Sequence, residues 1–202
     1  MIVFAITGLF VFVRSLAGRA VLALGAVALF NALTIGTVIS DALAAFVARL
    51  PVDTTFTGRA GLWRFAVDSI GERPLIGHGF FAFWRTEATQ SLAEGSGDWE
   101  TNWAGTAAHS HNGYLDTILG LGLIGLALTL VVLVLKPLRD FDRATRNEGT
   151  ASPFAMMFVQ IWLFGLMLSA MESFFFDRAD SIWVTFLFAV FGLHYLARFR
   201  TQ

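Results

Sequence analysis

The sequence contains no cysteine and has few charged residues. The absence of cysteine among its 202 residues excludes disulfide bonds and thiolate chemistry, although it leaves the cellular compartment open. Charged residues make up 14% of the chain, against about 25% in soluble domains. Lys and Arg number 14 and Asp and Glu 15, for a net charge of −1. Because that charge creates no field that attracts nucleic acid, we expect no nucleic-acid partner.

Long apolar runs take the place of charges. The mean hydropathy is +0.66, and 56% of the residues are hydrophobic. A membrane-spanning helix needs roughly 20 apolar residues, and four uncharged runs come close to that length: 20–39, 117–135, 154–171 and 181–197. Residues 1–13 are too short a run to cross a bilayer, so we expect a truncated first span. The sequence therefore predicts an all-α, polytopic membrane helix bundle of about five spans.

The basic residues orient these spans. Lys and Arg in short connections favour the cytoplasmic side, and they gather near residues 14–19, 136–146 and 198–200. We therefore expect two N-terminal spans in residues 1–48, the first of them incomplete. We expect a large periplasmic loop over residues 49–112. Residues 113–202 should form three further spans, with a basic cytoplasmic loop at 136–152.

An amphipathic helix is predicted inside the large loop. Apolar residues recur at helical spacing between Leu62 and Arg73, while charged residues line the opposite face. Thr57 is a candidate N-cap, and Pro74 should end the helix because proline disfavours a helical residue before it. Trp63 and Trp84 suit the level of lipid headgroups, so we expect this helix to lie on the outer leaflet.

A histidine-rich run precedes the third long apolar stretch. His111 and Asn112 would stand at the N-terminus of a helix, where free N–H groups and the helix dipole disfavour an imidazolium. A neutral imidazole there can act as a general base. Two other interpretations stay open: the two histidines cap the helix in a wet interface, or His109 and His111 bind a metal ion. The metal site would be completed by Asp116, Glu100 or Asp98.

Arginines and acidic residues supply further candidates. Arg59 follows a Thr57-Gly58 turn, and a guanidinium binds phosphate oxygens in a fork, which suits a lipid pyrophosphate. Alternatively, the arginines of this helix contact lipid headgroups or pair with its own carboxylates. A cluster at the short outer connection could pair internally or face the same cavity as His111; it comprises Glu172, Asp177, Arg178 and Asp180.

An ordered set of motifs resembles the O-antigen ligase and polymerase superfamily of bacterial envelope glycosyltransferases. The motifs are TGRAGLW at 57–63, ERPLIGHGFF at 72–81, HSHNGYL at 109–115 and GLIG at 122–125. The superfamily pattern is a histidine, an amide residue, nine further residues and then G-x-x-G. FWRTE at 83–87 and ESFFFDR at 172–178 look most like exopolysaccharide polymerases of the succinoglycan type. Full members have about ten to fourteen spans, so the resemblance implies a missing N-terminal half.

The resemblance implies a metal-independent, inverting glycosyl transfer without a cofactor. The donor would be an undecaprenyl-pyrophosphate-linked glycan, and the acceptor a sugar hydroxyl on the outer face of the inner membrane. His111 would deprotonate this hydroxyl and Arg59 would hold the pyrophosphate. Further substrate contacts are expected at Arg73, His109, Asn112, Glu172 and Arg178. The expected partners are the lipid-linked donor, the glycan acceptor, the bilayer and a chain-length regulator.

Three functions remain in competition at this stage. A polymerase would join lipid-linked repeats to each other, whereas a ligase would pass a finished glycan to the lipid A core. A non-catalytic scaffold or transporter is the third interpretation. Polar residues concentrate outside the apolar runs, which argues against a transport path, because such a path needs ionisable groups within the bilayer.

Overall fold

The structure is a computed structural model that describes residues 2–13, 15–51, 53, 56, 58–95, 106–148 and 152–199. All regular structure in these ranges is helical, which confirms the predicted all-α class. The chain divides into two compact units. The unit called here the bundle unit comprises Met1–Ala28, Leu128–Leu168 and Phe174–Gln202. The site unit comprises Leu29–Ala127 and Ser169–Ser173.

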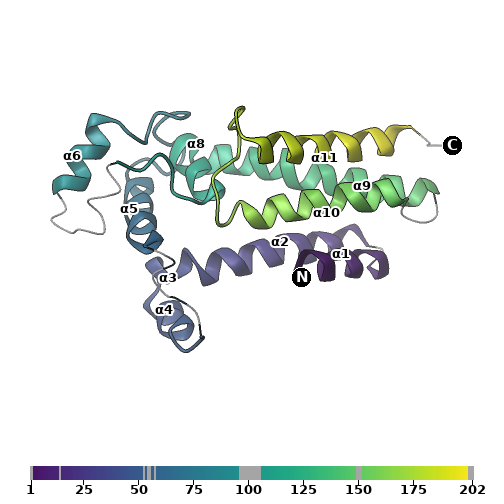
Figure 1. The fold of residues 1–202 in the computed structure, drawn as a ribbon, viewed down its shortest axis with the longest axis horizontal. Coiled ribbons are helices and arrows are strands. Elements are labelled where there is room, and N and C mark those ends of the chain that lie inside the picture. Colours follow the sequence, from purple (N-terminus) through teal and green to yellow (C-terminus); the bar gives the residue numbers. More distant parts are fainter. Residues whose placement is uncertain are drawn as a thin grey trace. The chain divides into compact units, whose positions relative to one another are not determined.

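Figure 1 labels the helices that the structure describes. In chain order they are α1 (Ile2–Phe12), α2 (Leu16–Leu33), α3 (Gly36–Ile39), α4 (Asp41–Val47), α5 (Arg59–Glu72), α6 (Glu87–Gly95), α8 (Gly113–Leu130), the π-helix η2 (Val131–Leu135), α9 (Lys136–Glu148), α10 (Pro153–Leu168) and α11 (Ser181–Arg198).

Within the described ranges, three helices are long and apolar enough to cross a membrane, and the chain is a helical membrane protein. They are Leu16–Leu33, Gly113–Arg146 and Ser181–Arg198. The other two expected spans correspond to α10, an apolar helix of 16 residues, and to α1, which has 11. At about 1.5 Å per residue, both fall short of a hydrocarbon core of about 30 Å.

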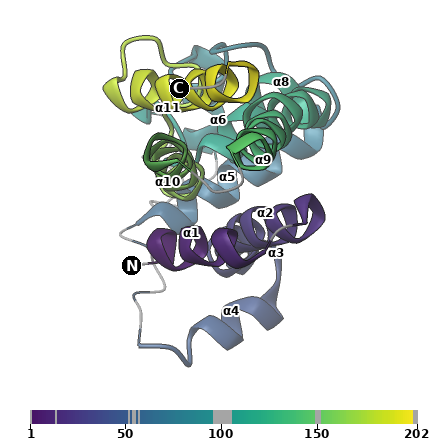
Figure 2. The ribbon, with the colours of Figure 1, turned by 90° about the vertical axis from the view of Figure 1, so that its right-hand side faces the viewer.

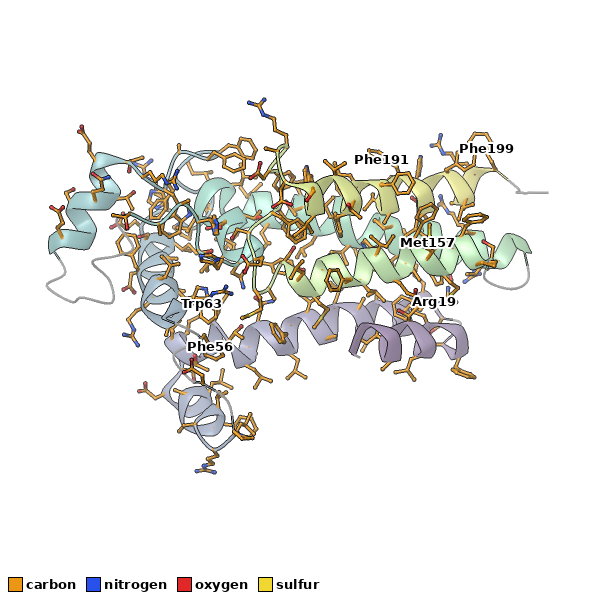
Figure 3. All side chains as sticks on the ribbon, in the orientation of Figure 1. Arg19, Phe56, Trp63, Met157, Phe191 and Phe199 are labelled. Atoms are coloured by element: carbon orange, nitrogen blue, oxygen red, sulfur yellow. The ribbon has the colours of Figure 1, made fainter. Side chains whose placement is uncertain are left out.

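Within the bundle unit, α11 packs against both α9 and α10, and α10 also contacts α1. Figure 2 shows α9 and α10 nearly end-on, with α11 extending across them. Trp162 of α10 is fully buried, and its Nε1–H donates to the carbonyl of Leu133, 2.7 Å away, in the π-helix. Phe191 of α11 and Phe199, which directly follows this helix, are labelled in Figure 3 and are both exposed, as expected where a helix faces lipid.

Arg19 ties the N-terminal helices of the bundle unit to α9. Its guanidinium is buried (Figure 3) and donates to the carbonyls of Phe10 and Val13, where α1 ends. Its Nη1 lies 3.1 Å from Oδ1 of Asp142. A buried cation requires such partners, because an unpaired charge away from water is costly.

Residues 136–148 differ from the expected basic loop at 136–152. They form α9, which continues the helix of α8 and η2. Pairs four residues apart support this polar helix: Lys136 with Asp140 at 3.0 Å, and Arg146 with Asp142 at 2.9 Å. Asp140 and Asp142 are nevertheless buried, as are Leu138 and Phe141, which are each 1% exposed. The charged residues that indicated a connection thus belong to a packed helix.

In the site unit, α5 occupies the position of the predicted amphipathic helix and ends before Pro74. Its apolar face packs inside the protein, so the expectation that Trp63 anchors the helix among lipid headgroups is wrong. Trp63 is fully buried and lies 5.2 Å from the ring of Phe56 (Figure 3). The surrounding core comprises Ile35, Leu62, Phe65, Ala66, Phe83, Ala107, Leu115 and Leu119. The predicted cap, Thr57, lies outside the described residues, and Gly58 occupies the N-cap position with φ 84°.

The helix α8 is interrupted at Gly122, where φ is 67° and ψ −172°. Pro74 to Gly79 pairs with α8 around this break through four backbone hydrogen bonds of 2.7–3.3 Å. They run from His78 to Leu119, from Gly79 to Gly120, from Leu123 to Pro74 and from Ile124 to Leu75. A Cβ atom at Gly122 would lie 2.1 Å from the carbonyl oxygen of Leu75. Glycine is therefore required both by the backbone angles and by the close approach.

Candidate functional site

Asn112 begins the helix that positions the histidines. Its side-chain oxygen accepts the backbone N–H groups of Tyr114 and Leu115 at 3.1 and 2.9 Å, the geometry of an N-cap. Its Nδ2 donates to Oδ1 of Asn31 and to the carbonyl of Ala170, both at 2.9 Å. Asn112 is fully buried, so its amide is satisfied inside the protein. The cap role is filled by this amide rather than by an imidazole.

The turn before α8 is also held by its neighbours. The indole N–H of Trp63 donates to the carbonyl of Ser110 at 2.9 Å. The backbone N–H of Ser110 lies 3.1 Å from both oxygens of Asp116. The same carboxylate accepts the indole N–H of Trp84 at 2.8 Å, and the N–H of Gly113 donates to Ser169 at 2.7 Å. Local and long-range contacts thus fix the backbone that carries His111.

His111 stands in this turn with φ 55°, in the left-handed region. This conformation is uncommon for residues other than glycine and is found at functional sites that the surrounding structure holds in place. Nδ1 of His111 lies 3.1 Å from Oε2 of Glu172, and the histidine side chain is 32% exposed. The structure therefore holds one ring nitrogen on a carboxylate while part of the ring reaches solvent.

Arg59, the first residue of α5, also binds the carboxylate of Glu172. Its Nη2 donates to Oε1 of Glu172 at 2.9 Å, and its Nη1 donates to the carbonyl of Met171 at 2.6 Å. These two bonds use two of the five N–H donors of a guanidinium. The side chain is 18% exposed, compared with 41% for Glu172. One carboxylate therefore joins a histidine and an arginine that are far apart in the sequence.

The protonation of Glu172 determines the tautomer of His111. Burial raises the pKa of Glu172, but the hydrogen bonds from His111 and Arg59 and their charges outweigh it. The pKa of this carboxyl consequently lies below its ordinary value of 4.5, and the group is ionised at neutral pH. Because a carboxylate only accepts hydrogen bonds, Nδ1 of His111 must donate. A neutral His111 then carries its lone pair on Nε2, where a base needs it.

His109 lies beside His111, with ring centroids 4.3 Å apart. Its Nδ1 accepts the backbone N–H of His111 at 3.2 Å, so a neutral His109 carries its proton on Nε2. Burial and the charge of His111 lower the pKa of His109 below its ordinary value of 6.5. This ring can therefore offer a hydrogen-bond donor next to the candidate base.

The structure brings together four of the seven residues expected at the site. Arg59, His109, His111 and Glu172 form one cluster in the site unit, whereas Asn112 supports it from within. Arg73 is exposed at the C-terminal end of α5. Arg178 is exposed and belongs to the bundle unit. Near it, Asp180 caps α11 through the N–H groups of Ile182 and Trp183.

Sequence reasoning missed the role of Glu172 as the common partner of His111 and Arg59. The acidic cluster and the ESFFFDR motif pointed to Glu172 as a substrate contact, but sequence spacing carries no information on contacts this distant. The metal interpretation required at least one acidic ligand in addition to His109 and His111. Over the ranges that the structure describes, no group of three or more His, Asp or Glu side chains is arranged to hold a metal ion. Asp98 and Glu100 lie outside those ranges.

Comparison with known proteins gives a consistent family. A family model described as "O-Antigen ligase" matches residues 1–130, well over half of the chain. The "Exopolysaccharide production protein ExoQ" of Rhizobium meliloti (strain 1021) is 33% identical over 119 residues, covering 55% of this chain and 26% of that protein. A protein of Rickettsia bellii (strain RML369-C) named "Putative polysaccharide ligase" is 32% identical over 130 residues. That match covers 64% of this chain and 30% of the Rickettsia protein.

The chain thus aligns with less than a third of the length of these relatives. No solved structure matches it significantly. The family match confirms the resemblance found in the sequence motifs.

Proposed function

Because this chain belongs to the O-antigen ligase family, we propose that it contributes the catalytic base and an anion clamp to a membrane polysaccharide polymerase. This enzyme would join repeat units carried on undecaprenyl pyrophosphate, at the periplasmic face of the inner membrane. One observation carries the proposal: the carboxylate of Glu172 holds the imidazole of His111 at 3.1 Å and the guanidinium of Arg59 at 2.9 Å.

The first step is removal of a proton from the acceptor hydroxyl. Nε2 of His111 takes this proton while the hydroxyl oxygen attacks the anomeric carbon of the donor sugar. The resulting imidazolium is stabilised by Glu172, whose carboxylate already accepts the Nδ1–H group. His109 can donate its Nε2–H to an oxygen of the acceptor sugar.

The transfer also requires a leaving group that departs with the bonding electrons. As the new glycosidic bond forms, the bond between the anomeric carbon and the pyrophosphate oxygen breaks, and the configuration inverts. Arg59 has N–H donors beyond the two bound by Met171 and Glu172, and they suit the developing charge. Pyrophosphate leaves as a stable anion, so no acid is needed, whereas glycosidases commonly use two carboxylic groups.

The remaining expected contacts fit the substrates in this proposal. Arg73 and Arg178 are exposed cations that suit phosphate groups or anionic headgroups. Asn112 acts indirectly, because its buried amide caps α8 and holds the turn of His111.

A ligase is the second candidate, and the names of the similar proteins favour it: the family is described as "O-Antigen ligase" and the Rickettsia protein as "Putative polysaccharide ligase". It would use the same base and clamp with a lipid A core acceptor. The products separate the two. Loss of a polymerase leaves single repeats on the lipid carrier, whereas loss of a ligase leaves long lipid-linked chains.

Alanine variants test the proposed chemistry. In a complete protein carrying this chain, His111→Ala should lower the polymer formation rate about 10²–10⁴-fold, the range for loss of a general base. Arg59→Ala should cost about 10²–10³-fold, as expected for loss of a charge-stabilising group. Arg64→Ala is the matched control, because Arg64 is an exposed residue of the same helix.

The result is interpreted at equal membrane levels of each variant. If His111→Ala restores high-molecular-weight polymer to a null strain as well as the wild type does, the assignment of the base is wrong. If Arg64→Ala is as inactive as Arg59→Ala, the charge of the helix matters rather than a specific clamp. A scaffold would tolerate all three substitutions.

A further inference from the structure

A group of large apolar side chains is exposed on the segment that follows α5. Leu75, Ile76, Phe80 and Phe81 are 59%, 72%, 58% and 67% exposed. Residues 74–84 contain no Asp, Glu, Lys or Arg. The segment is bounded by Arg73 and Arg85, and both arginines are exposed. This composition is unfavourable for a loop in water, because a contiguous exposed apolar patch marks a surface that contacts another apolar phase.

The contacts with α8 fix the depth of this segment. Its four backbone hydrogen bonds reach α8 between Leu119 and Ile124, inside the helix Gly113–Arg146 that is long and apolar enough to cross a membrane. At about 1.5 Å per residue, these positions lie roughly 9–16 Å along the helix from Gly113. Leu123 and Ile124 are themselves about half exposed. The segment therefore lies at the level of hydrocarbon-facing residues of α8.

Hydrocarbon tolerates non-helical backbone only when its polar groups are paired inside the protein. The segment meets this condition at the positions nearest α8. The N–H groups of His78 and Gly79 and the carbonyls of Pro74 and Leu75 bond to α8, and the N–H of Gly77 donates to Arg73. Nε2 of His78 lies 2.8 Å from the carbonyl of Ser69. These polar atoms thus bond to protein partners, while the four large side chains stay exposed.

We propose that residues 74–81 form a re-entrant segment of the membrane, in which Leu75, Ile76, Phe80 and Phe81 contact lipid acyl chains. The flanking Arg73 and Arg85 then stand where the chain leaves the hydrocarbon, and arginines at such positions extend toward the headgroups. The break in α8 at Gly122 allows the backbone of this segment to approach the membrane helix closely. The inference does not depend on the roles of His111 or Arg59.

The absence of cysteine makes a direct test simple. Ile76→Cys and Phe81→Cys are made separately in the full chain, labelled with an environment-sensitive fluorophore, and reconstituted in phosphatidylcholine–phosphatidylglycerol vesicles. Leu123→Cys on α8 is the reference for hydrocarbon depth, and Gln90→Cys, an exposed position of α6, is the reference for water. Quenching is measured with nitroxide-labelled lipids and with aqueous iodide.

Both labels should be quenched by nitroxide lipids to within about twofold of the label at 123, and protected from iodide. Iodide quenching like that at 90 would place the segment in water and overturn the proposal. Protection from both quenchers would also overturn it, because another protein segment would then cover the surface. Two labelled positions keep the test independent of the folding of either variant.

Discussion

Replacing Glu172 by glutamine exchanges one carboxylate oxygen for an NH₂ group and leaves the size of the side chain nearly unchanged. Glu172 accepts hydrogen bonds from Nδ1 of His111 and Nη2 of Arg59. A glutamine offers one oxygen and one NH₂ group, so it cannot accept from both donors in this geometry. If its oxygen stays with Arg59, its NH₂ faces His111. The imidazole must then accept on Nδ1, which moves the remaining proton to Nε2 and removes the base.

The size of the effect follows from the one bond that is lost, between Glu172 and His111. Hydrogen bonds to charged groups contribute about 1.5–3 kcal/mol each. The side chain of Glu172 is 41% exposed, so solvent screening favours the lower end of that range. Loss of one bond at about 1.5 kcal/mol corresponds to about 10-fold in rate. We expect this loss mainly in kcat, because the tautomer affects proton transfer rather than donor binding.

The measurement is the initial rate of polymer formation from lipid-linked repeats in membranes that contain equal amounts of each variant. Asp177→Asn is the matched control, because it makes the same carboxylate-to-amide change in the same connection. Its Oδ1 accepts the N–H of Ala179 at 2.9 Å, a bond that an amide oxygen keeps. A full rate for Glu172→Gln, with His111→Ala inactive, would refute the reasoning that the carboxylate sets the tautomer.

Three further variants test other parts of the site unit. Gly122→Ala should lower the free energy of unfolding by at least about 3 kcal/mol. The backbone angles at this position are essentially restricted to glycine, and the Cβ of an alanine would overlap Leu75. An unchanged Tm in detergent would contradict this expectation. Gly25→Ala, whose Cβ would meet nothing within 4 Å, is the control and should leave Tm unchanged or slightly raised. His109→Asn should reduce the loss of Tm between pH 7.5 and 5.5. The pKa of His109 is lowered in the folded state, so below pH 6.5 the unfolded chain binds the extra proton and the wild type loses stability; equal losses in both proteins would refute this. Asn112→Ala should destabilise the chain by about 2–4 kcal/mol through loss of the cap and of buried hydrogen bonds, which chemical unfolding can measure; a loss below about 1 kcal/mol would show that the cap is dispensable.

Features encoded by neighbouring residues were predictable. Proline after Arg73 marks the end of α5, and His111-Asn112 marks the start of α8. Both signals act through backbone geometry within one turn, so the sequence alone carries them. The apolar runs also predicted the all-α membrane fold, because an isolated spanning segment must satisfy its own backbone hydrogen bonds.

Features that depend on distant partners were not predictable. The amphipathic pattern around Trp63 fits a lipid surface and a protein core equally well, and only the contacts with Phe56 and Ser110 decide between them. Likewise, the charges of α9 resemble those of a loop until Leu138 and Phe141 are seen to be buried. Glu172 could be selected as polar, but its simultaneous contact with α5 and the histidine turn requires three-dimensional information.

The pairing of Pro74–Gly79 with α8 constrains how the protein can be made. The segment leaves the ribosome well before α8, which begins only at Gly113. Until α8 arrives, the N–H groups of His78 and Gly79 and the carbonyls of Pro74 and Leu75 lack the partners they have in the finished fold. Water must supply those hydrogen bonds in the meantime, because a bilayer cannot. Biosynthesis therefore has to keep this stretch hydrated and pack it late, after α8 has formed.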